Sequence, residues 1–198
     1  DDKKKKLPKY PKSIGVLTSS SGSVIHDIIH RISERFPVVQ IKVFPISVQG
    51  KNSHIEIIDF LDLIENYDSK DFLKPDLIIF ARGGGSLEEL MPFNEPDLIK
   101  RVFKLKIPNI SAIGHDTDYT LLDYVSDLRA PTPTAAAEIA VPDKNYLLNQ
   151  IHDLQVKLNQ SIDQKYLSIE QLLLKFKNSV NYFSNSIKDV ENKLSKIN

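Results

Sequence analysis

The sequence contains no cysteine and no long hydrophobic run among its 198 residues. Without cysteine there is no disulfide and no thiolate metal site, and the absence suits a reducing compartment. No apolar run approaches the roughly 20 residues of a membrane-spanning helix, and the N-terminal residues lack the apolar core of a signal peptide. We therefore expect a soluble, cytoplasmic protein that makes no membrane contact.

An excess of charge of either sign is also missing, because 26 Lys and Arg residues balance 26 Asp and Glu residues. The overall charge therefore attracts no polyanion, and any contact with nucleic acid must be local. The basic run from Lys3 to Lys6 precedes Pro8 and Pro11, a pattern typical of a linker. We assign residues 1–12 to a basic linker, with nucleic-acid contact as the alternative to a solvated tail.

Glycine is scarce, yet three of the seven glycines are consecutive, at Gly83, Gly84 and Gly85. They follow the apolar run 77–80 and precede a helix-like stretch. Consecutive glycines let the backbone approach a ligand and turn its N–H groups toward an anion, and the planar Arg82 guanidinium matches phosphate oxygens. The segment from Arg82 to Ser86 thus predicts a phosphate clamp; the alternative is a tight turn with a surface arginine.

Strand-like and helix-like runs alternate from Ile14 to about Ile113, which predicts an α/β domain over residues 13–142 with a Rossmann-like open, mostly parallel sheet flanked by helices. The expected strands are 14–17, 38–46, 77–81 and 109–113, and the expected helices are 23–35, 53–67 and 96–105. Ser53 with Glu56 has capping-box spacing, and Asn94 precedes a proline as an N-cap residue would. The same spacing at Ser86 marks Glu89 as structural.

Three polar loops follow the first, third and fourth predicted strands, at 18–22, 82–86 and 114–118. Ligands of parallel sheets bind outside the carboxyl ends of the strands, so these loops should share one edge. In the first loop the predicted anion-binding residues are Thr18, Ser19, Ser20 and Gly22. Plain helix capping is the alternative for its hydroxyls, and Asp27 either points toward the ligand edge or faces solvent.

The third loop carries an imidazole and two carboxylates within five residues, Gly114 to Asp118. Histidine titrates near neutral pH, so His115 suits proton transfer, while Asp118 can orient the imidazole. A hydrogen-bonded turn without catalytic role is the alternative. Mg²⁺ binding through Asp27, Asp116 and Asp118 also stays open.

Residues 143–198 contain neither glycine nor proline. Apolar residues recur there at alternating steps of three and four, with a change of phase between Ile162 and Tyr166. A single helix of this length would span about 80 Å, and its apolar stripe would need a coiled-coil partner. Two or three shorter helices folded into a bundle are the alternative.

Between the two regions, the segment from Arg129 to Thr134 is stiffened by prolines and leads into an alanine-rich helix start. It either guides a DNA strand, with Arg129 as a contact, or only aims the long helix. Aromatic residues for base stacking are sparse near the loops. Tyr119 is a candidate, whereas Phe93 is assigned to the core.

Three ordered motifs resemble those of the large subunit of bacterial exonuclease VII: IGVLTSSSG with a following aspartate, RGGGSLEELMPFNEP, and GHDTDYTLLDYVSDLRAPTPTAAAE. The match is strong over residues 7–142 and weak over the long helix. The resemblance implies catalytic roles for Asp27, Arg82, His115 and Asp118. The first loop departs slightly, since residues 23 and 24 are not the two alanines common in the family and His26 stands where a basic residue is usual.

The resemblance implies an exodeoxyribonuclease that degrades single-stranded DNA from its ends to short oligonucleotides without requiring a divalent metal. Its implied partners are small helical subunits bound to the long helix, and self-association is also possible. The family's N-terminal oligonucleotide-binding barrel and longer helical C-terminus are not in this sequence. From the residues alone, a non-enzymatic phosphate-binding scaffold module and a metal-dependent hydrolase are the alternatives.

Overall fold

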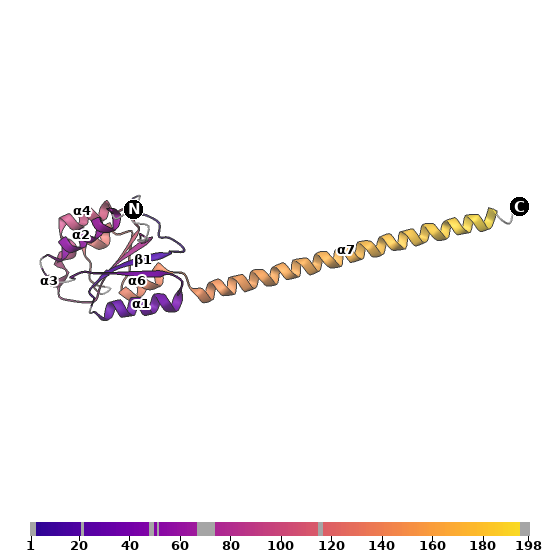
Figure 1. Cartoon of the computed structure of the whole chain (residues 1–198). Coiled ribbons are helices and arrows are strands. Elements are labelled where there is room, and N and C mark those ends of the chain that lie inside the picture. Colours follow the sequence, from indigo (N-terminus) through magenta and orange to yellow (C-terminus); the bar gives the residue numbers. More distant parts are fainter. Residues whose placement is uncertain are drawn as a thin grey trace. The chain divides into compact units, whose positions relative to one another are not determined.

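The computed structural model describes residues 3–20, 22–47, 50, 52–66, 74–114 and 117–194. The chain divides into two units, Asp1–Tyr146 and Leu147–Asn198. The first unit holds all the strands, and the second is the greater part of one long helix (Figure 1).

A five-stranded sheet forms the centre of the first unit, and every neighbouring pair of strands is parallel. Its strands are β1 (Ser13–Thr18), β2 (Gln40–Pro45), β3 (Leu77–Arg82), β4 (Asn109–Ile113) and β5 (Leu128–Arg129). Parallel neighbours require a crossover, and helices lie in the connections between successive strands. The predicted α/β class with a parallel sheet is therefore confirmed.

The strand order β2-β1-β3-β4-β5 contains one reversal of direction. The chain moves outward from β1 to β2 and then returns to the other side of β1 to form β3. The loops that follow β1 and β3 therefore diverge to opposite sides. In doubly wound sheets this switch point is where ligands bind, outside the carboxyl ends of the strands.

Helices cover both faces of the sheet, as Figure 1 shows. One face carries α1 (Ser23–Arg35) and α6 (Pro133–Ala140), and the other carries α2 (Ser53–Asn66), α4 (Pro96–Phe103) and α5 (Leu121–Val125). The short α3 (Leu87–Leu90) and the 3₁₀ helix η1 (Met91–Asn94) follow β3 directly. Both faces of the parallel sheet are therefore buried.

Side chains of β3 alternate between the two cores, as strand geometry requires. Leu77 and Ile79 pack with α1 and α6, whereas Ile78 and Phe80 pack with α2 and α4. Continuing the alternation, Arg82 extends from the same face as Phe80. Phe93 is buried in this second core, which confirms its predicted core role.

At two predicted helix caps the expected capping hydrogen bonds do not form, although the helices begin nearly where expected. Ser53 Oγ donates to the Gly50 carbonyl, and the Glu56 carboxylate accepts from the backbone and hydroxyl of Ser47, so no capping box forms there. The N-cap of α4 is Glu95. Asn94 Oδ1 instead accepts from Leu121 N at 2.7 Å, a tertiary bond that sequence spacing does not reveal.

Strand predictions also needed correction at two places. The second strand begins at Gln40 and not at Val38, which is exposed. The fifth strand was not predicted, because a two-residue strand has too few residues to display an alternating pattern.

The residues that precede β1 contact the sheet unit. Lys5 N donates to Asp127 Oδ1 at 2.7 Å, and Lys5 Nζ lies 3.0 Å from Asp127 Oδ2. Leu7 packs against the core that α1 and α6 cover. Most of the segment expected to be a basic linker thus follows the surface of the unit between these contacts and β1.

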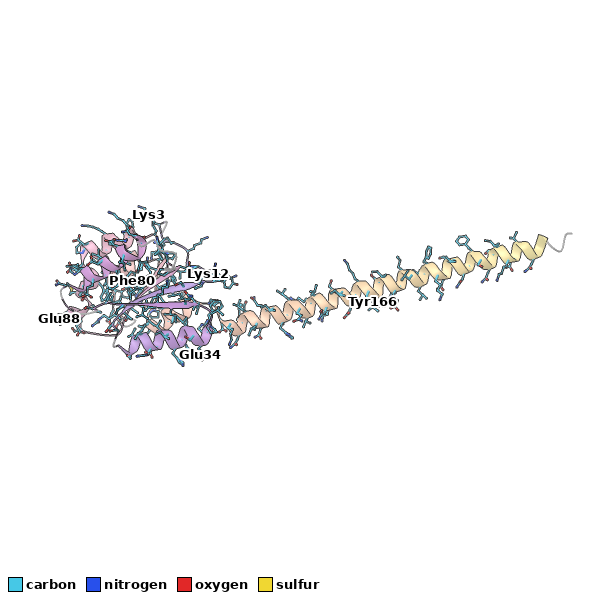
Figure 2. All side chains as sticks on the ribbon, in the orientation of Figure 1. Lys3, Lys12, Glu34, Phe80, Glu88 and Tyr166 are labelled. Carbon is cyan, nitrogen blue, oxygen red and sulfur yellow. The ribbon has the colours of Figure 1, made fainter. Side chains whose placement is uncertain are left out.

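The long helix α7 (Lys144–Leu194) is a single helix of 51 residues, roughly 75 Å at 1.5 Å per residue. Asp143 Oδ1 accepts from the N–H groups of Asn145 and Tyr146 at its start. From residue 148 to 190 every side chain is exposed, including the apolar stripe (Figure 2). The structure therefore has one continuous helix here and not the alternative of two or three shorter helices folded into a bundle.

Among the described residues, no helix combines the length and the apolar character that crossing a membrane requires.

Candidate functional site

Arg82 ends β3 at the switch-point edge, and its side chain is only 3% exposed. Its Nη2 donates to Glu89 Oε2 at 2.9 Å. The backbone N–H of Ser86 donates to the same oxygen at 3.0 Å. Two donors, one of them a guanidinium and the other at the start of α3, therefore converge on a single carboxylate oxygen.

Glu89 forms a capping box with Ser86, as its spacing predicts. The hydrogen bond from Arg82 is the largest cause that lowers the pKa of Glu89, and the hydrogen bond from Ser86 N is the next. Glu89 is therefore an anion at neutral pH. Its bond to Arg82 was not predicted, since the capping-box pattern explains Glu89 without a partner on β3.

The predicted phosphate-clamp glycines lie where the backbone must pass close to other groups. A Cβ on Gly83 would lie 3.2 Å from Val24 Cγ2, in the first turn of α1. Gly83 O accepts from Arg82 Nη1 at 3.4 Å. Gly84, Gly85 and Ser86 are exposed. The turn after β3 therefore packs against the first turn of α1, while its outer side is exposed to solvent.

The structure brings Asp118 to the end of β3. Gly114 N donates to Arg82 O at 3.2 Å, so the loop after β4 continues the pairing of the two strands. Gly114 has a φ of +73°, and a Cβ there would lie 2.9 Å from Asp118 Oδ2. Asp118 therefore packs against the backbone directly beside Arg82.

Arg129 joins the same cluster from β5. Its Nη2 donates to Asp118 O at 3.1 Å. Its guanidinium carbon lies 3.9 Å from the centroid of the Tyr119 ring. The structure thus brings together Arg82, Asp118 and Arg129, from three neighbouring strand ends.

The first loop lies on the β1 side of this edge. Thr18 is buried and its carbonyl accepts from Ile46 N at 3.0 Å. Ser19 is half-buried, Ser20 is exposed, and Gly22 is the N-cap residue of α1. Thr18 is therefore buried at the end of β1, and its part in anion binding stays a prediction.

Asp27 is exposed on α1. Residues three apart are neighbours on a helix surface, so Asp27 lies beside Val24, the residue that contacts the Gly83 turn. Within the part of the chain that the structure describes, Asp27 makes no hydrogen bond to Arg82 or Asp118. Its place on α1 puts it near the switch-point edge.

The predicted proton-transfer residue, His115, lies outside the described residues, as does Asp116. Within the described parts of the chain, no three His, Asp or Glu side chains gather as metal ligands would.

Two buried carboxylates in the third motif were not predicted. Asp123 accepts from Ser111 Oγ at 2.6 Å and from Thr120 N at 2.8 Å. Asp127 accepts from Asn109 N at 2.9 Å and pairs with Lys5. The spacing of Thr120 and Asp123 is a capping-box signal that was available in the sequence.

The fold and the site together define a doubly wound α/β domain whose charged side chains gather at the carboxyl ends of its central strands. A family model described as "Exonuclease VII, large subunit" matches residues 1–198. The chain belongs to the exonuclease VII large-subunit family.

Curated relatives support this membership. The "Exodeoxyribonuclease 7 large subunit" of Natranaerobius thermophilus is 44% identical over 171 residues, which cover 86% of this chain and 39% of the relative. Those of Bartonella quintana and Rickettsia bellii are 49% and 44% identical, covering 87% and 93% of this chain and 36% and 41% of theirs. The chain thus spans about two fifths of the length of these relatives.

Among solved structures, a chain of the Vibrio vulnificus NanR protein complexed with ManNAc-6P matches with a TM-score of 0.29 and 13% identity, covering 81% of this chain and 56% of that one. A likeness this weak supports no statement about ligand or mechanism.

Proposed function

We propose that residues 13–142 form the catalytic domain of an exonuclease VII large subunit, and that residues 143–198 begin its coiled-coil extension. In this proposal the assembled enzyme hydrolyses phosphodiester bonds of single-stranded DNA from its ends and releases short oligonucleotides. Family membership and the cluster of charged groups at the switch-point edge support it.

The single observation that carries the proposal is the convergence of Arg82 Nη2 and Ser86 N on one carboxylate oxygen. A phosphate oxygen has the same charge sign and accepts the same two kinds of donor. The position that Glu89 Oε2 occupies is therefore one that the fold equips for an anion. Preorganised donors of this kind stabilise the charge that develops on a phosphate during bond cleavage.

Access to Arg82 depends on the turn above it. The side chain is almost fully covered, and Gly85, an exposed residue without a side chain, lies against its guanidinium. In the proposed mechanism the turn shifts when a strand binds, the scissile phosphate reaches the guanidinium, and the N–H groups of Gly83, Gly84 and Gly85 complete the clamp.

Proton transfer is assigned to His115, with the leaving oxygen or the attacking water as its partner. Asp118, held beside Arg82 and Gly114, orients the imidazole. Asp27, on the neighbouring helix, accepts the complementary proton. The proposal includes no required metal: cationic side chains supply the charge stabilisation.

The partners in this proposal follow from the two units. Single-stranded DNA binds at the loop edge, where Ser19, Ser20, Gly22 and Arg129 flank the clamp. The exposed apolar stripe of α7 binds the small subunits of exonuclease VII, or a second copy of this helix. We place the assembly in the cytoplasm.

The test is hydrolysis of end-labelled single-stranded DNA by the complete complex of large and small subunits, in the presence of a chelator. We expect turnover with the wild type, and losses of about a hundredfold or more for Arg82→Lys, His115→Ala and Asp118→Asn. Arg82→Lys keeps the charge but loses the planar fork, so it isolates geometry from charge. Near-normal turnover in any variant removes that residue from the mechanism.

The same assay separates the alternatives. Saturable binding of DNA or of a mononucleotide without cleavage indicates a non-enzymatic phosphate-binding module. Activity that the chelator abolishes and Mg²⁺ restores indicates a metal-dependent hydrolase. Glu88→Gln serves as the matched control, because Glu88 is exposed and neighbours the clamp in sequence.

A further inference from the structure

The loop edge continues into a surface that combines exposed aromatic rings with basic side chains. Tyr119 and Tyr124 are 59% and 67% exposed. Their ring centroids lie 6.3 Å apart with an interplanar angle of 35°. Arg129 covers one side of the Tyr119 ring at 3.9 Å.

We propose that Tyr119 and Tyr124 form a stacking platform for the bases of a single DNA strand, leading away from the cluster of Arg82 and Asp118. This inference rests on the proposed nuclease function and adds to it the path of the substrate. Aromatic faces stack on any base, and an arginine against such a ring adds positive charge toward the strand.

Position connects the platform to the site. Tyr119 follows Asp118 directly in the chain, and Arg129 contacts both, through the Asp118 carbonyl and the Tyr119 ring. A DNA strand whose phosphate lies at Arg82 would therefore place a neighbouring base near the Tyr119 ring. Tyr124 stands on α5, which runs from this edge back along the sheet.

Beyond Tyr124 the surface becomes basic. A pocket of about 340 Å³ is lined by Tyr124, Phe103, Lys3 and Lys4, among others. Lys3 Nζ lies 5.2 Å from the centroid of the exposed Phe103 ring. Figure 2 labels Lys3 on the side of the unit where α4 lies and Glu88 at the end where α3 lies.

The local charge favours a polyanion although the chain as a whole is neutral. The nearby carboxylates of Asp123 and Asp127 are buried and bonded within the fold. Lys3 and Lys4, by contrast, are exposed on the rim of the pocket. Rings for bases and cations for phosphates thus alternate along one surface, which is what a single strand requires.

The test compares the double variant Tyr119→Leu/Tyr124→Leu with the wild type in the complete complex of large and small subunits. The control is Tyr10→Leu, another exposed tyrosine with a lysine, Lys9, 5.5 Å from its ring centroid. We expect KM for a labelled single strand to rise about tenfold in the double variant, with kcat retained, and to stay unchanged in the control.

An abasic strand of equal length separates stacking from a merely structural effect. It offers phosphates but no bases, so the double variant and the wild type should share one KM on it. An equal rise in KM on both strands overturns the platform. An unchanged KM on the normal strand also overturns it. If the double variant sediments without the small subunits while KM is unaltered, the two tyrosines belong to a protein contact and the platform is overturned.

Failure of the proposed nuclease function gives a different result from failure of the stacking platform. If the wild-type complex cleaves neither strand, the hydrolytic assignment fails, and the platform is then judged from the Kd of each strand by fluorescence anisotropy. A Kd about tenfold weaker in the double variant, for the normal strand only, supports the platform. An unchanged Kd overturns it.

Discussion

Gly85 lies directly over the guanidinium of Arg82. A Cβ built on Gly85 would collide with both terminal nitrogens of Arg82 and with the carboxylate of Glu89. A side chain at this position would force the ends of Arg82 and Glu89 to move, so glycine permits the bond between them. The glycine-rich turn and the buried guanidinium are one structural feature.

Gly85→Ala should displace Arg82 from Glu89. We expect the variant to lose about 1–3 kcal/mol of unfolding free energy, as overpacked sites do, together with most of the DNA hydrolysis of the complex. Urea unfolding and turnover of labelled DNA measure the two effects. Glu88→Gln is the control, since Glu88 is an exposed residue of the neighbouring α3. Equal behaviour of the two variants would contradict the prediction.

Gly114→Ala should destabilise the loop that carries Asp118. The residue has a φ of +73°, which L side chains rarely adopt, and its Cβ would lie 2.8 Å from Asp118 Cβ. We expect a loss of about 1–3 kcal/mol in the free energy of unfolding, measured in urea. Gly114→Ala combined with Asp118→Gly removes the collision, which involves Asp118 Cβ, but not the backbone strain. If the loss of unfolding free energy in the double variant equalled the sum of the losses in the two single variants, the packing of Asp118 on Gly114 would be refuted.

Acid should release Glu89 from Arg82. The pKa of Glu89 is lowered in the folded protein, first by the hydrogen bond from Arg82 and then by that from Ser86 N. A carboxylate with a lowered folded pKa stabilises the fold above its unfolded pKa, about 4.3 for glutamate, and the contribution disappears as the pH falls through the folded pKa.

The Tm of the wild type should therefore fall more steeply than that of Glu89→Gln as the pH decreases below about 4.3. Calorimetry of both proteins across this interval measures the difference. Glu88→Gln should keep the wild-type slope. Parallel curves for wild type and Glu89→Gln would show that the ion pair does not form in solution.

Asp127→Ala should be among the most destabilising single changes in the first unit. The side chain is 2% exposed and accepts from the backbone N–H groups of Lys5 and Asn109. Its removal leaves buried donors unpaired, at a cost of roughly 2–4 kcal/mol in the free energy of unfolding. Asp127→Asn keeps an acceptor oxygen and should lose less. Denaturant titration compares them, and equal losses would argue that charge alone matters.

Acidic substitutions on the stripe of α7 should weaken assembly without unfolding the first unit. Leu173→Glu places a charge on a face that is apolar at alternating steps of three and four. We expect at least about a tenfold weaker association with the small subunits, because a partner would have to bury that charge. Gln171→Glu, two residues earlier and on the opposite side of the helix, is the control. Sedimentation of the mixed subunits measures both.

Much of the fold was predictable from local patterns. The four longer strands, the starts of α1 and α2, and the apolar stripe of α7 with its change of phase all follow from the periodicity of apolar residues and from the position of glycine and proline. The capping box of Ser86 and Glu89 was also local. Two features were not: the short β5, and the tertiary acceptor role of Asn94, whose cap-like spacing was misleading.

The candidate site was predictable only as a set of loops. Parallel strand order places the ends of β1, β3 and β4 on one edge, so Arg82 and Asp118 could be expected near each other. Their actual partners could not. Glu89 meets Arg82, and Arg129 meets Tyr119, through folding of loops whose paths no periodicity describes.

The sequence by itself determined most of the secondary structure, because periodicity and capping depend on neighbours a few residues apart. The alternation of strands and helices also indicated a parallel sheet, whose strand ends gather the polar loops at one edge. Only the tertiary structure decided which charges pair there. Arg82 is covered by Gly85 and held by Glu89 through a turn whose path no periodicity describes. Gly114 N reaches Arg82 O, and Arg129 reaches Asp118 O, because β3, β4 and β5 are adjacent in space although loops and helices separate them in the chain.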